Sequence, residues 1–387
     1  MANIIPILIL LSFSVWAIFS LYIFASRNGT FDHFGAVLDR GILPDGTPLV
    51  PVTTGGTYPT IDWQIKAPAA FLWSFEGNGL HPDASLAGFL FAGAWAPSWI
   101  LIVLESFRRG NRRRLISFIS IWGVFQFQNA HAFVTPLYLA VHLFTSPMAT
   151  IAKVDDVLID PVNLLVLPAS FIMGFVIPSI LCALPAPSVV SIRFKQTAFG
   201  IYQQWNLFIA LPHFILAMIL RWAAPSSCIV ERKSLPKLYR RVYAFAFALA
   251  AMSYLPVMII TCTAAIWPAL FSEDCVHLLQ PSHVLVPTSP FSGLKAKDLA
   301  QGMFWLAQWD YFGGNFAQLI WAVVLYRKAR TTIGLETLWV DTIKRALFYL
   351  LIGGPIGIAV GMIWERDELL LGLESKMGEE EPLLPSS

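Results

Sequence analysis

One aspartate in the middle of an apolar segment, Asp310, is the residue whose position most strongly suggests chemistry. An ionisable group within lipid costs roughly 2.5 to 3.5 kcal/mol, so it is a functional-site hypothesis by default. At 100° per residue, Met303, Gly314, Ala317 and Trp321 share its face of a helix. Small residues beside an acid could leave room for a ligand. Alternatively, they let two helices pack closely while Asp310 forms a hydrogen bond across the interface.

Two glutamates complete the predicted catalytic set. Glu105 closes the second apolar stretch of the chain, and Glu76 lies among aromatic residues just before that stretch. Burial disfavours the charged form of a carboxyl group, so either side chain could carry a proton near neutral pH and donate it as a general acid. For Glu105, the alternative is an ion pair with the arginines that follow it.

Polar side chains also form two stripes that could line a pocket. Gln128, His131, Thr135, Tyr138 and His142 fall within about 80° of one helix circumference, and Gln203, Asn206 and His213 align on another. Aligned polarity in a membrane helix must face other helices or a wet cavity, although a lone histidine is usually a hydrogen-bond partner between helices. The expected substrate-binding residues are Gln128, Asn129, His131, Asn206, His213 and Asn315, with the aromatic residues Trp305, Trp309, Tyr311, Phe312 and Trp321 near Asp310.

The sequence lacks the motifs of several common enzyme chemistries. The chain has no NDxxD-like carboxylate cluster for magnesium-diphosphate chemistry and no HxxHH or HxxxH array for a di-iron site. It also has no GxSxG, GxGxxG or P-loop. We therefore expect no metal and no cofactor. Acid chemistry on an apolar substrate remains, as does binding or transport.

Composition places these residues in a membrane. Of 387 residues, 56% are apolar and only 13% are charged, against about 25% in soluble proteins. This excludes an ordinary water-soluble enzyme. A net charge of +2 gives no reason to expect nucleic-acid binding.

Apolar stretches of roughly 20 residues are long enough to cross a bilayer as helices. The sequence therefore predicts an all-α polytopic bundle of about 7–8 spans, which forms a single domain over residues 1–370. The loop 26–83 would carry an interfacial cap at 69–76, and residues 371–387 would form an acidic disordered tail. The expected spans are 4–25, 84–104, 115–144, 161–184, 199–222, 242–268, 299–326 and 346–364.

The positions of the basic segments conflict with this set of spans. Segments 108–114, 231–241 and 327–330 are all strongly basic, and the positive-inside rule would put all three in the cytoplasm. Three expected spans separate the first from the second, and an odd number puts them on opposite sides. One span is therefore wrong, with 115–144 and the proline-broken 161–184 the weakest, or one basic segment is lumenal. The sequon Asn28-Gly29-Thr30 would fit a lumenal, glycosylated first loop.

A family resemblance emerges from Phe71-Leu72-Trp73, Gly77, Pro82 and Ser85-Leu86, followed by the Glu-Ser-Phe-Arg-Arg-Gly-Asn run at 105–111. These residues resemble the amino-terminal signature of fungal integral-membrane terpene cyclases of meroterpenoid biosynthesis. The resemblance implies that a protein acid protonates an epoxide or terminal alkene of a prenylated, farnesyl-type aromatic or polyketide and starts a metal-free cation cyclisation.

The resemblance implies that Glu105 and Asp310 are the acids that protonate the substrate. Glu76 is included for its local chemistry, because it occupies a place where an Asp-Gly pair is more typical. The resemblance further implies an endoplasmic-reticulum membrane protein in a pathway that contains oxidases and prenyltransferases. The competing hypothesis is a multi-span transporter or ligand-binding membrane protein that uses Asp310 and the His and Asn stripes.

Overall fold

The molecule is helical throughout, and an isolated bridge between Ile42 and Pro48 is the only β pairing among the described residues. The computed structural model describes residues 3–49, 54–76, 81–150, 154–223, 234–336 and 338–380, and the side chains of 76 and 373–380 are not among them. The main helices are α1 (Ile4–Ala17), α2 (Phe24–Arg27), α3 (Thr30–Arg40), α4 (Pro59–Glu76), α5 (Pro82–Phe107), α6 (Ile119–Asn129), α7 (His131–Thr145), α8 (Val154–Val157), α9 (Pro161–Phe171), α10 (Ile177–Ala183), α11 (Ile192–Tyr202), α12 (Trp205–Ala223), α14 (Leu235–Ile266), α15 (Glu273–Val276), α16 (Pro281–Val284), α17 (Leu299–Thr332) and α18 (Trp339–Glu380).

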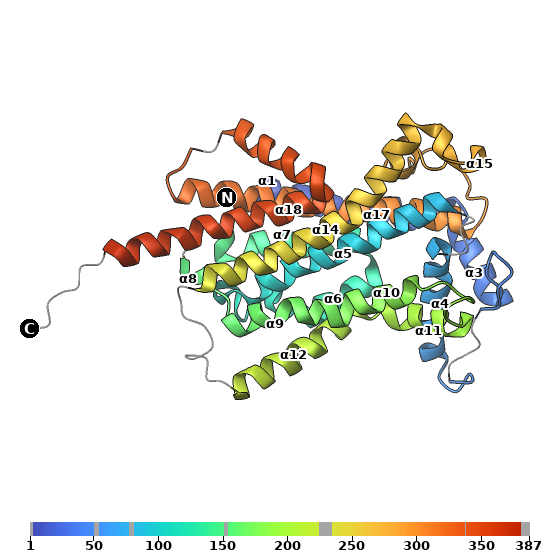
Figure 1. The fold of residues 1–387 in the computed structure, drawn as a ribbon, viewed down its shortest axis with the longest axis horizontal. Helices are drawn as coiled ribbons and strands as arrows, with labels where there is room; N and C mark the ends of the chain where they lie inside the picture. The colour runs from blue at the N-terminus through green and yellow to red at the C-terminus, as the bar shows by residue number, and fades with distance from the viewer. Residues whose placement is uncertain are drawn as a thin grey trace, which may run out of the picture.

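The all-α prediction is confirmed. Within the described residues, six segments are long and apolar enough to cross a membrane, so the expected 7–8 spans are not reached. α17 is not one of the six, because polar residues such as Gln308, Asp310 and Asn315 interrupt its apolar sequence. Nevertheless, α17 runs along the length of the bundle beside α18, α7, α5 and α1 (Figure 1).

The expected span 115–144 is instead a pair of helices, α6 and α7, that enters the bundle and returns to the same end. Ala130 separates the two with φ 71° and ψ 150°. Beyond α7, Ser146 Oγ donates to Asn111 Oδ1 at 2.6 Å, and Arg114 donates to the Thr145 carbonyl oxygen, so the segments flanking the pair meet. The 11 residues of α6 rise about 16 Å, roughly half of a 30 Å hydrocarbon core. The two helices therefore form a hairpin whose first helix is too short to cross that core.

α18 makes a second hairpin where one span was expected over 346–364. Gly354 has φ 65° and ψ −163°, a backbone conformation that side chains rarely permit. Two residues before Gly354 bond to one residue after it: Arg345 Nη1 donates to Glu365 Oε2 at 2.5 Å, and Tyr349 Oη donates to Glu365 Oε1 at 2.6 Å. On a straight helix, Glu365 would be about 30 Å from Arg345 and about 24 Å from Tyr349. The chain therefore reverses at Gly354.

The α6–α7 hairpin removes the conflict between the basic segments. Residues 108–114, the described part of the second segment at 234–241, and 327–330 lie at one end of the bundle, on the left in Figure 1. Lys328 Nζ donates to Asn3 Oδ1 and to the Ala149 carbonyl oxygen, which ties the end of α17 to the amino terminus at this end. Because the α6–α7 hairpin contributes no crossing, an even number of crossings separates the first two basic segments.

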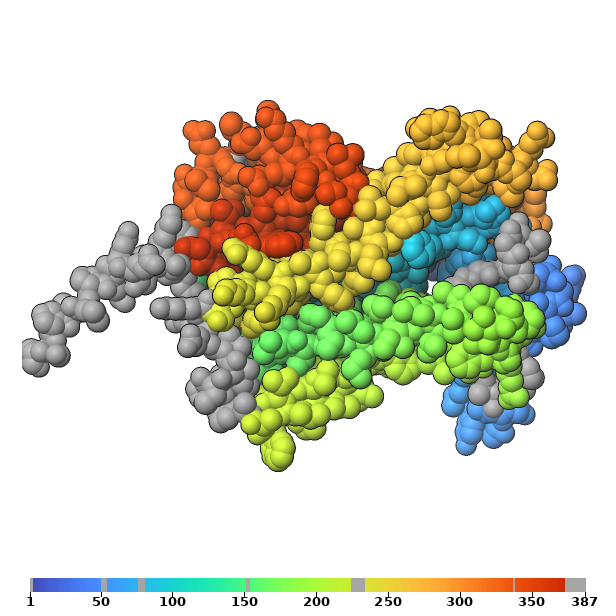
Figure 2. Space-filling model, in the orientation of Figure 1, coloured from blue at the N-terminus to red at the C-terminus, as the bar shows by residue number. Residues whose placement is uncertain are grey.

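Apolar side chains cover the outside of the bundle. α12 and the first part of α18 project from opposite edges of the molecule (Figure 2), and both expose large apolar residues, among them Leu211, Phe214, Trp222, Leu347, Phe348 and Leu351. Such a surface suits lipid and not water. Together with the six apolar helices, it supports an integral membrane protein.

The expected loop 26–83 is largely helical. It contains α3 and α4, and α4 packs against α11 and α5 at the end of the bundle away from the basic segments (Figure 1). The predicted cap 69–76 is the second half of α4, held in part by Trp73 Nε1, which donates to Asp45 Oδ2 at 3.0 Å. At the other terminus, α18 continues to Glu380, so helix extends into the predicted tail 371–387. Residues 381–387 lie outside the described part.

Candidate active site

Asp310 lies where α17 crosses the tip of the α6–α7 hairpin. Its side chain is 3% exposed, and its Oδ1 accepts the backbone N–H of Ala132 at 2.5 Å. The backbone N–H groups in the first turn of a helix have no partner within that helix, so Asp310 caps α7 from a neighbouring helix. No cationic side chain is paired with Asp310 among the described residues.

Glycines in α17 let the hairpin approach this closely. A Cβ on Gly314 would overlap the His131 ring, and one on Gly313 would overlap Ala132. The space beside these glycines is therefore filled by protein, as the close-packing alternative predicted. Room for a ligand lies on another side of Asp310.

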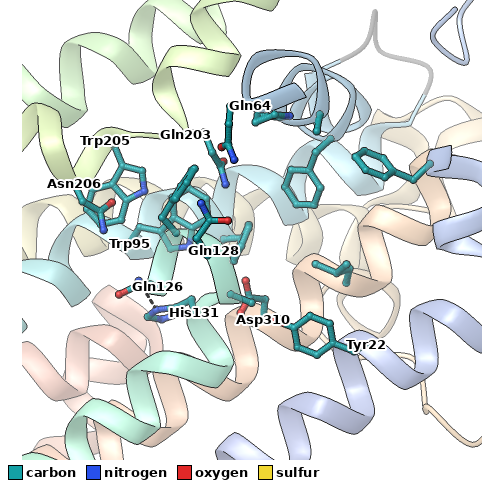
Figure 3. Close-up of a pocket in the computed structure, with 18 of the residues that line it drawn as sticks. Tyr22, Gln64, Trp95, Gln126, Gln128, His131, Gln203, Trp205, Asn206 and Asp310 are labelled. Atoms are coloured by element: carbon teal, nitrogen blue, oxygen red, sulfur yellow. Dashed lines mark hydrogen bonds between the residues drawn. The ribbon is translucent and has the colours of Figure 1, made fainter. Parts of the chain in front are cut away.

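That room is a cavity of about 280 Å³ between α3, α4, α5, α6, α7, α12 and α17 (Figure 3). Four predicted site residues line it: Asp310, Gln128, His131 and Asn206. The other lining residues were not predicted from the sequence: Tyr22, Phe34, Trp63, Gln64, Ala67, Pro68, Phe71, Phe91, Trp95, Gln126, Phe127, Ala130, Gln203, Trp205 and Leu306. Gln203 could have been predicted from the sequence, since it belongs to one of the two polar stripes.

Aromatic rings from α5 and α12 form one wall of this cavity. Phe91 and Trp95 meet edge to face with centroids 4.6 Å apart, and Trp95 stacks on Trp205 at 6.0 Å. Aromatic rings that border a cavity can attract a cation that lies over their faces.

The aromatic residues expected around Asp310 point elsewhere. Trp305 stacks on Phe24, Trp309 Nε1 donates to the Thr288 carbonyl oxygen, and Trp321 Nε1 donates to His142 Nδ1. Phe312 stacks on Phe316, and Tyr311 packs in a separate cluster with Leu90 and Val257. None of the five lines the cavity. Sequence neighbours on a helix lie about 100° apart, whereas the cavity-lining Leu306 is four residues before Asp310.

His131 is the histidine beside Asp310 in the cavity. Its Nδ1 lies 2.8 Å from Thr135 Oγ1 and 3.2 Å from Gln126 Nε2. Its Nε2 is buried without a hydrogen-bond partner among the described residues. Asn315 does not line the cavity, and its Nδ2 donates to the Tyr311 carbonyl oxygen at 2.8 Å.

His213 faces a second cavity of about 320 Å³ between α5, α6, α9 and α12. Phe107 stacks on the His213 ring at 5.0 Å. Asn206 borders both cavities. It therefore shares a cavity with Asp310, whereas His213 does not.

Glu105 lies in a buried ion-pair cluster and not at the cavity. Its Oε1 accepts from Arg108 Nε and Arg366 Nη2, both at 2.8 Å, and its Oε2 lies 3.0 Å from His142 Nε2. Asp367 pairs with both arginines at 2.7 Å. Two carboxylates thus balance two guanidinium groups, and the cluster joins α5, α7 and α18. Trp321 extends it to α17.

The remaining predicted residues lie outside the cavity or outside the described side chains. Glu76 is the last residue of α4, and its side chain lies outside the described part. Asn129 Nδ2 donates to the Phe125 carbonyl oxygen at 3.0 Å. Asn28 is 2% exposed, and its Oδ1 accepts from the backbone N–H and the hydroxyl of Thr30. An N-linked glycan would attach to Nδ2, and the burial of the Asn28 side chain leaves no room for it.

The cavity wall is poor in charge. Among its described residues there is no Lys or Arg, and Asp310 is the acid. In the part of the chain that the structure describes, no three His, Cys, Asp or Glu side chains lie close enough together to hold a metal ion.

Comparison with known proteins gives consistent matches along nearly the whole chain. The CtvD domain family matches residues 6–371. The chain is 29% identical over 366 residues to terpene cyclase ascI of Acremonium egyptiacum, covering 93% of this chain and 91% of that protein. It is 28% identical over 371 residues to terpene cyclase ctvD of Aspergillus terreus, covering 93% and 98%, and 23% identical over 359 residues to terpene cyclase atmA of Aspergillus flavus, covering 93% and 96%. No solved structure matches it.

Proposed function

This chain belongs to the CtvD family of membrane terpene cyclases of fungal secondary metabolism, as its sequence resemblance indicated, and we propose that Asp310 is the acid that starts its reaction. The substrate is a prenylated, farnesyl-type aromatic or polyketide. Its terminal epoxide or alkene takes the proton, and the resulting cation closes the rings.

The observation that carries this proposal is the contrast between the two buried acids. Glu105 has three cationic or hydrogen-bonding partners, which stabilise its charged form, and it does not reach the cavity. Asp310 borders the cavity, is buried, and has no cation beside it among the described residues. Without a cationic partner, the buried charge is costly, so the neutral acid is favoured. We therefore assign Glu105 a structural role.

A protonated Asp310 matches its own contacts. The carbonyl oxygen of a carboxylic acid can accept the Ala132 N–H, while its hydroxyl donates. The proton passes to the epoxide oxygen or to the terminal alkene carbon and leaves a tertiary cation. Ring closure follows as each double bond attacks the cation. Loss of a proton, or attack by a substrate hydroxyl that then loses its proton, ends the sequence. One proton enters and one leaves, so product and substrate have equal mass.

The cavity wall supports the later steps. Faces of Phe91, Trp95 and Trp205 can stabilise the moving cation, an interaction worth about 0.5–2 kcal/mol per ring. Apolar surroundings also limit early capture of the cation by water. Upstream, a prenyltransferase must build the substrate, and an oxidase must supply any epoxide. We place the protein in the endoplasmic reticulum membrane, with its basic end in the cytoplasm.

The test is conversion in microsomes that contain the full chain. Farnesylated phenol and its terminal epoxide are supplied separately, and products are identified by mass spectrometry and NMR. We expect a cyclised isomer from at least one substrate, with EDTA causing no loss. An unchanged substrate that crosses the membrane would favour a transporter, and loss of activity with EDTA would contradict proton initiation.

A further inference from the structure

Three glutamines converge on the cavity from segments far apart in the sequence. Gln64 lies on α4, Gln128 on α6, and Gln203 directly after α11. Figure 3 shows their side chains in succession along one wall, on the way to Asp310. We call these three residues the amide triad.

The amide triad lies at the mouth of the cavity. Gln128 is exposed, and Gln64 and Gln203 are half-buried, whereas Asp310 and His131 are almost fully buried. A long substrate that reaches Asp310 must therefore place its other end beside the triad. A linear prenyl chain has no polar atoms except at its head and at an oxidised terminus, so the head is the part that meets the amides.

The triad amides have unused hydrogen-bonding capacity. Each glutamine offers two N–H donors and one carbonyl acceptor, and none of the three side chains bonds to another described residue. By contrast, Gln126 contacts His131, and Asn206 Nδ2 donates to the Gly123 carbonyl oxygen at 3.0 Å. Bonds from the triad are therefore available to a ligand.

Charge defines the class of head that fits. A diphosphate or carboxylate head would need cationic partners to offset its lost hydration. The described wall supplies no Lys or Arg, and Asp310 would repel an anion once ionised. Neutral amides instead match a neutral ring that bears both hydroxyl donors and carbonyl or hydroxyl acceptors.

From this geometry we propose that the amide triad recognises an uncharged, multiply oxygenated head ring and directs the attached prenyl chain toward Asp310. The inference deepens the proposed cyclase function and rests on it for the identity of the chain. It assigns substrate selection to Gln64, Gln128 and Gln203, and proton donation to Asp310.

The test measures binding and turnover separately, with the purified full chain in lipid nanodiscs. The probes are a farnesylated resorcinol with two free hydroxyls and its di-O-methyl ether, and binding is followed by quenching of tryptophan fluorescence. Gln64→Met, Gln128→Met and Gln203→Met keep side-chain length but remove the amide. Each should raise the Kd for the free resorcinol about three- to tenfold, the effect of one lost hydrogen bond, with less than a twofold change for the ether.

Gln204→Met is the matched control, since Gln204 adjoins Gln203 but does not line the cavity. It should change neither Kd. Equal weakening of both probes, or no weakening of either, would overturn the inference, as would tighter binding of a farnesylated benzoate anion. If the variants behave as expected but the wild-type chain cyclises nothing, the inference stands and the proposed function fails. If turnover depends on Asp310 but the triad variants bind like wild type, the proposed function stands and the inference about the triad fails.

Discussion

Replacing Asp310 with Asn and with Ala should separate the chemistry of this residue from its structural contact. Asn retains an oxygen that can accept the Ala132 N–H, but it has no acidic proton. Ala loses both and leaves that buried N–H without its partner, at a cost of about 1–3 kcal/mol. We expect both variants to lose turnover, but only Asp310→Ala to lose stability as well.

The size of the expected loss follows from the role of a general acid. Such a group contributes typically about 10²–10⁴-fold to a rate, which corresponds to about 3–5.5 kcal/mol of barrier at 1.36 kcal/mol per tenfold. Asp310→Asn should therefore lower the rate of cyclisation at least about a hundredfold. Its thermal unfolding in detergent should stay close to wild type, whereas Asp310→Ala should unfold at a lower temperature.

The assay is product formation in microsomes, normalised to the amount of folded protein measured by size-exclusion chromatography. Asp310→Glu is a useful third variant, because it restores the acid on a longer side chain. Turnover by Asp310→Asn within threefold of wild type would refute the assignment of proton donation to this residue. Equal stability of the Asn and Ala variants would show that the contact with Ala132 does not hold the hairpin.

Three further predictions concern the buried ion-pair cluster around Glu105, the aromatic wall and the topology. Glu105→Gln should lower the free energy of unfolding by about 3–5 kcal/mol and reduce the yield of folded protein, because it leaves buried guanidinium charge uncompensated; a stable, inactive variant would instead favour a catalytic role. Trp95→Leu should slow cyclisation about tenfold per folded molecule, whereas Trp309→Leu, which lies outside the cavity, should not slow it. Equal effects of the two substitutions in a product assay would show that the aromatic wall takes no part in the mechanism. In a chain without native cysteines, Arg112→Cys and Arg241→Cys should react with an impermeant maleimide from the same side of the membrane, and labelling from opposite sides would contradict the re-entrant α6–α7 hairpin.

Sequence alone was sufficient for the class of the protein, and it singled out the one acid among the described residues that line the cavity. Hydropathy and low charge indicate membrane helices because the backbone can satisfy its polar groups in lipid only within regular structure. Asp310 was singled out because an ionisable group is costly within a membrane segment. The polar stripes likewise identified Gln128, His131 and Asn206, which line the cavity. These properties are local, since each depends on a residue and its neighbours along one helix.

The tertiary structure decided which apolar segments cross the bundle and which residues share a site. Hydropathy reports the length of an apolar run, but not that the chain reverses at Ala130 or at Gly354. The sequence suggested Glu105 as a proton donor because it does not show that Arg366, 261 residues away, pairs with Glu105 in the folded bundle. Gln64 and Gln203 line the same cavity as Gln128 for the same reason. Contacts between helices are set by packing in three dimensions, which no periodicity within one helix records.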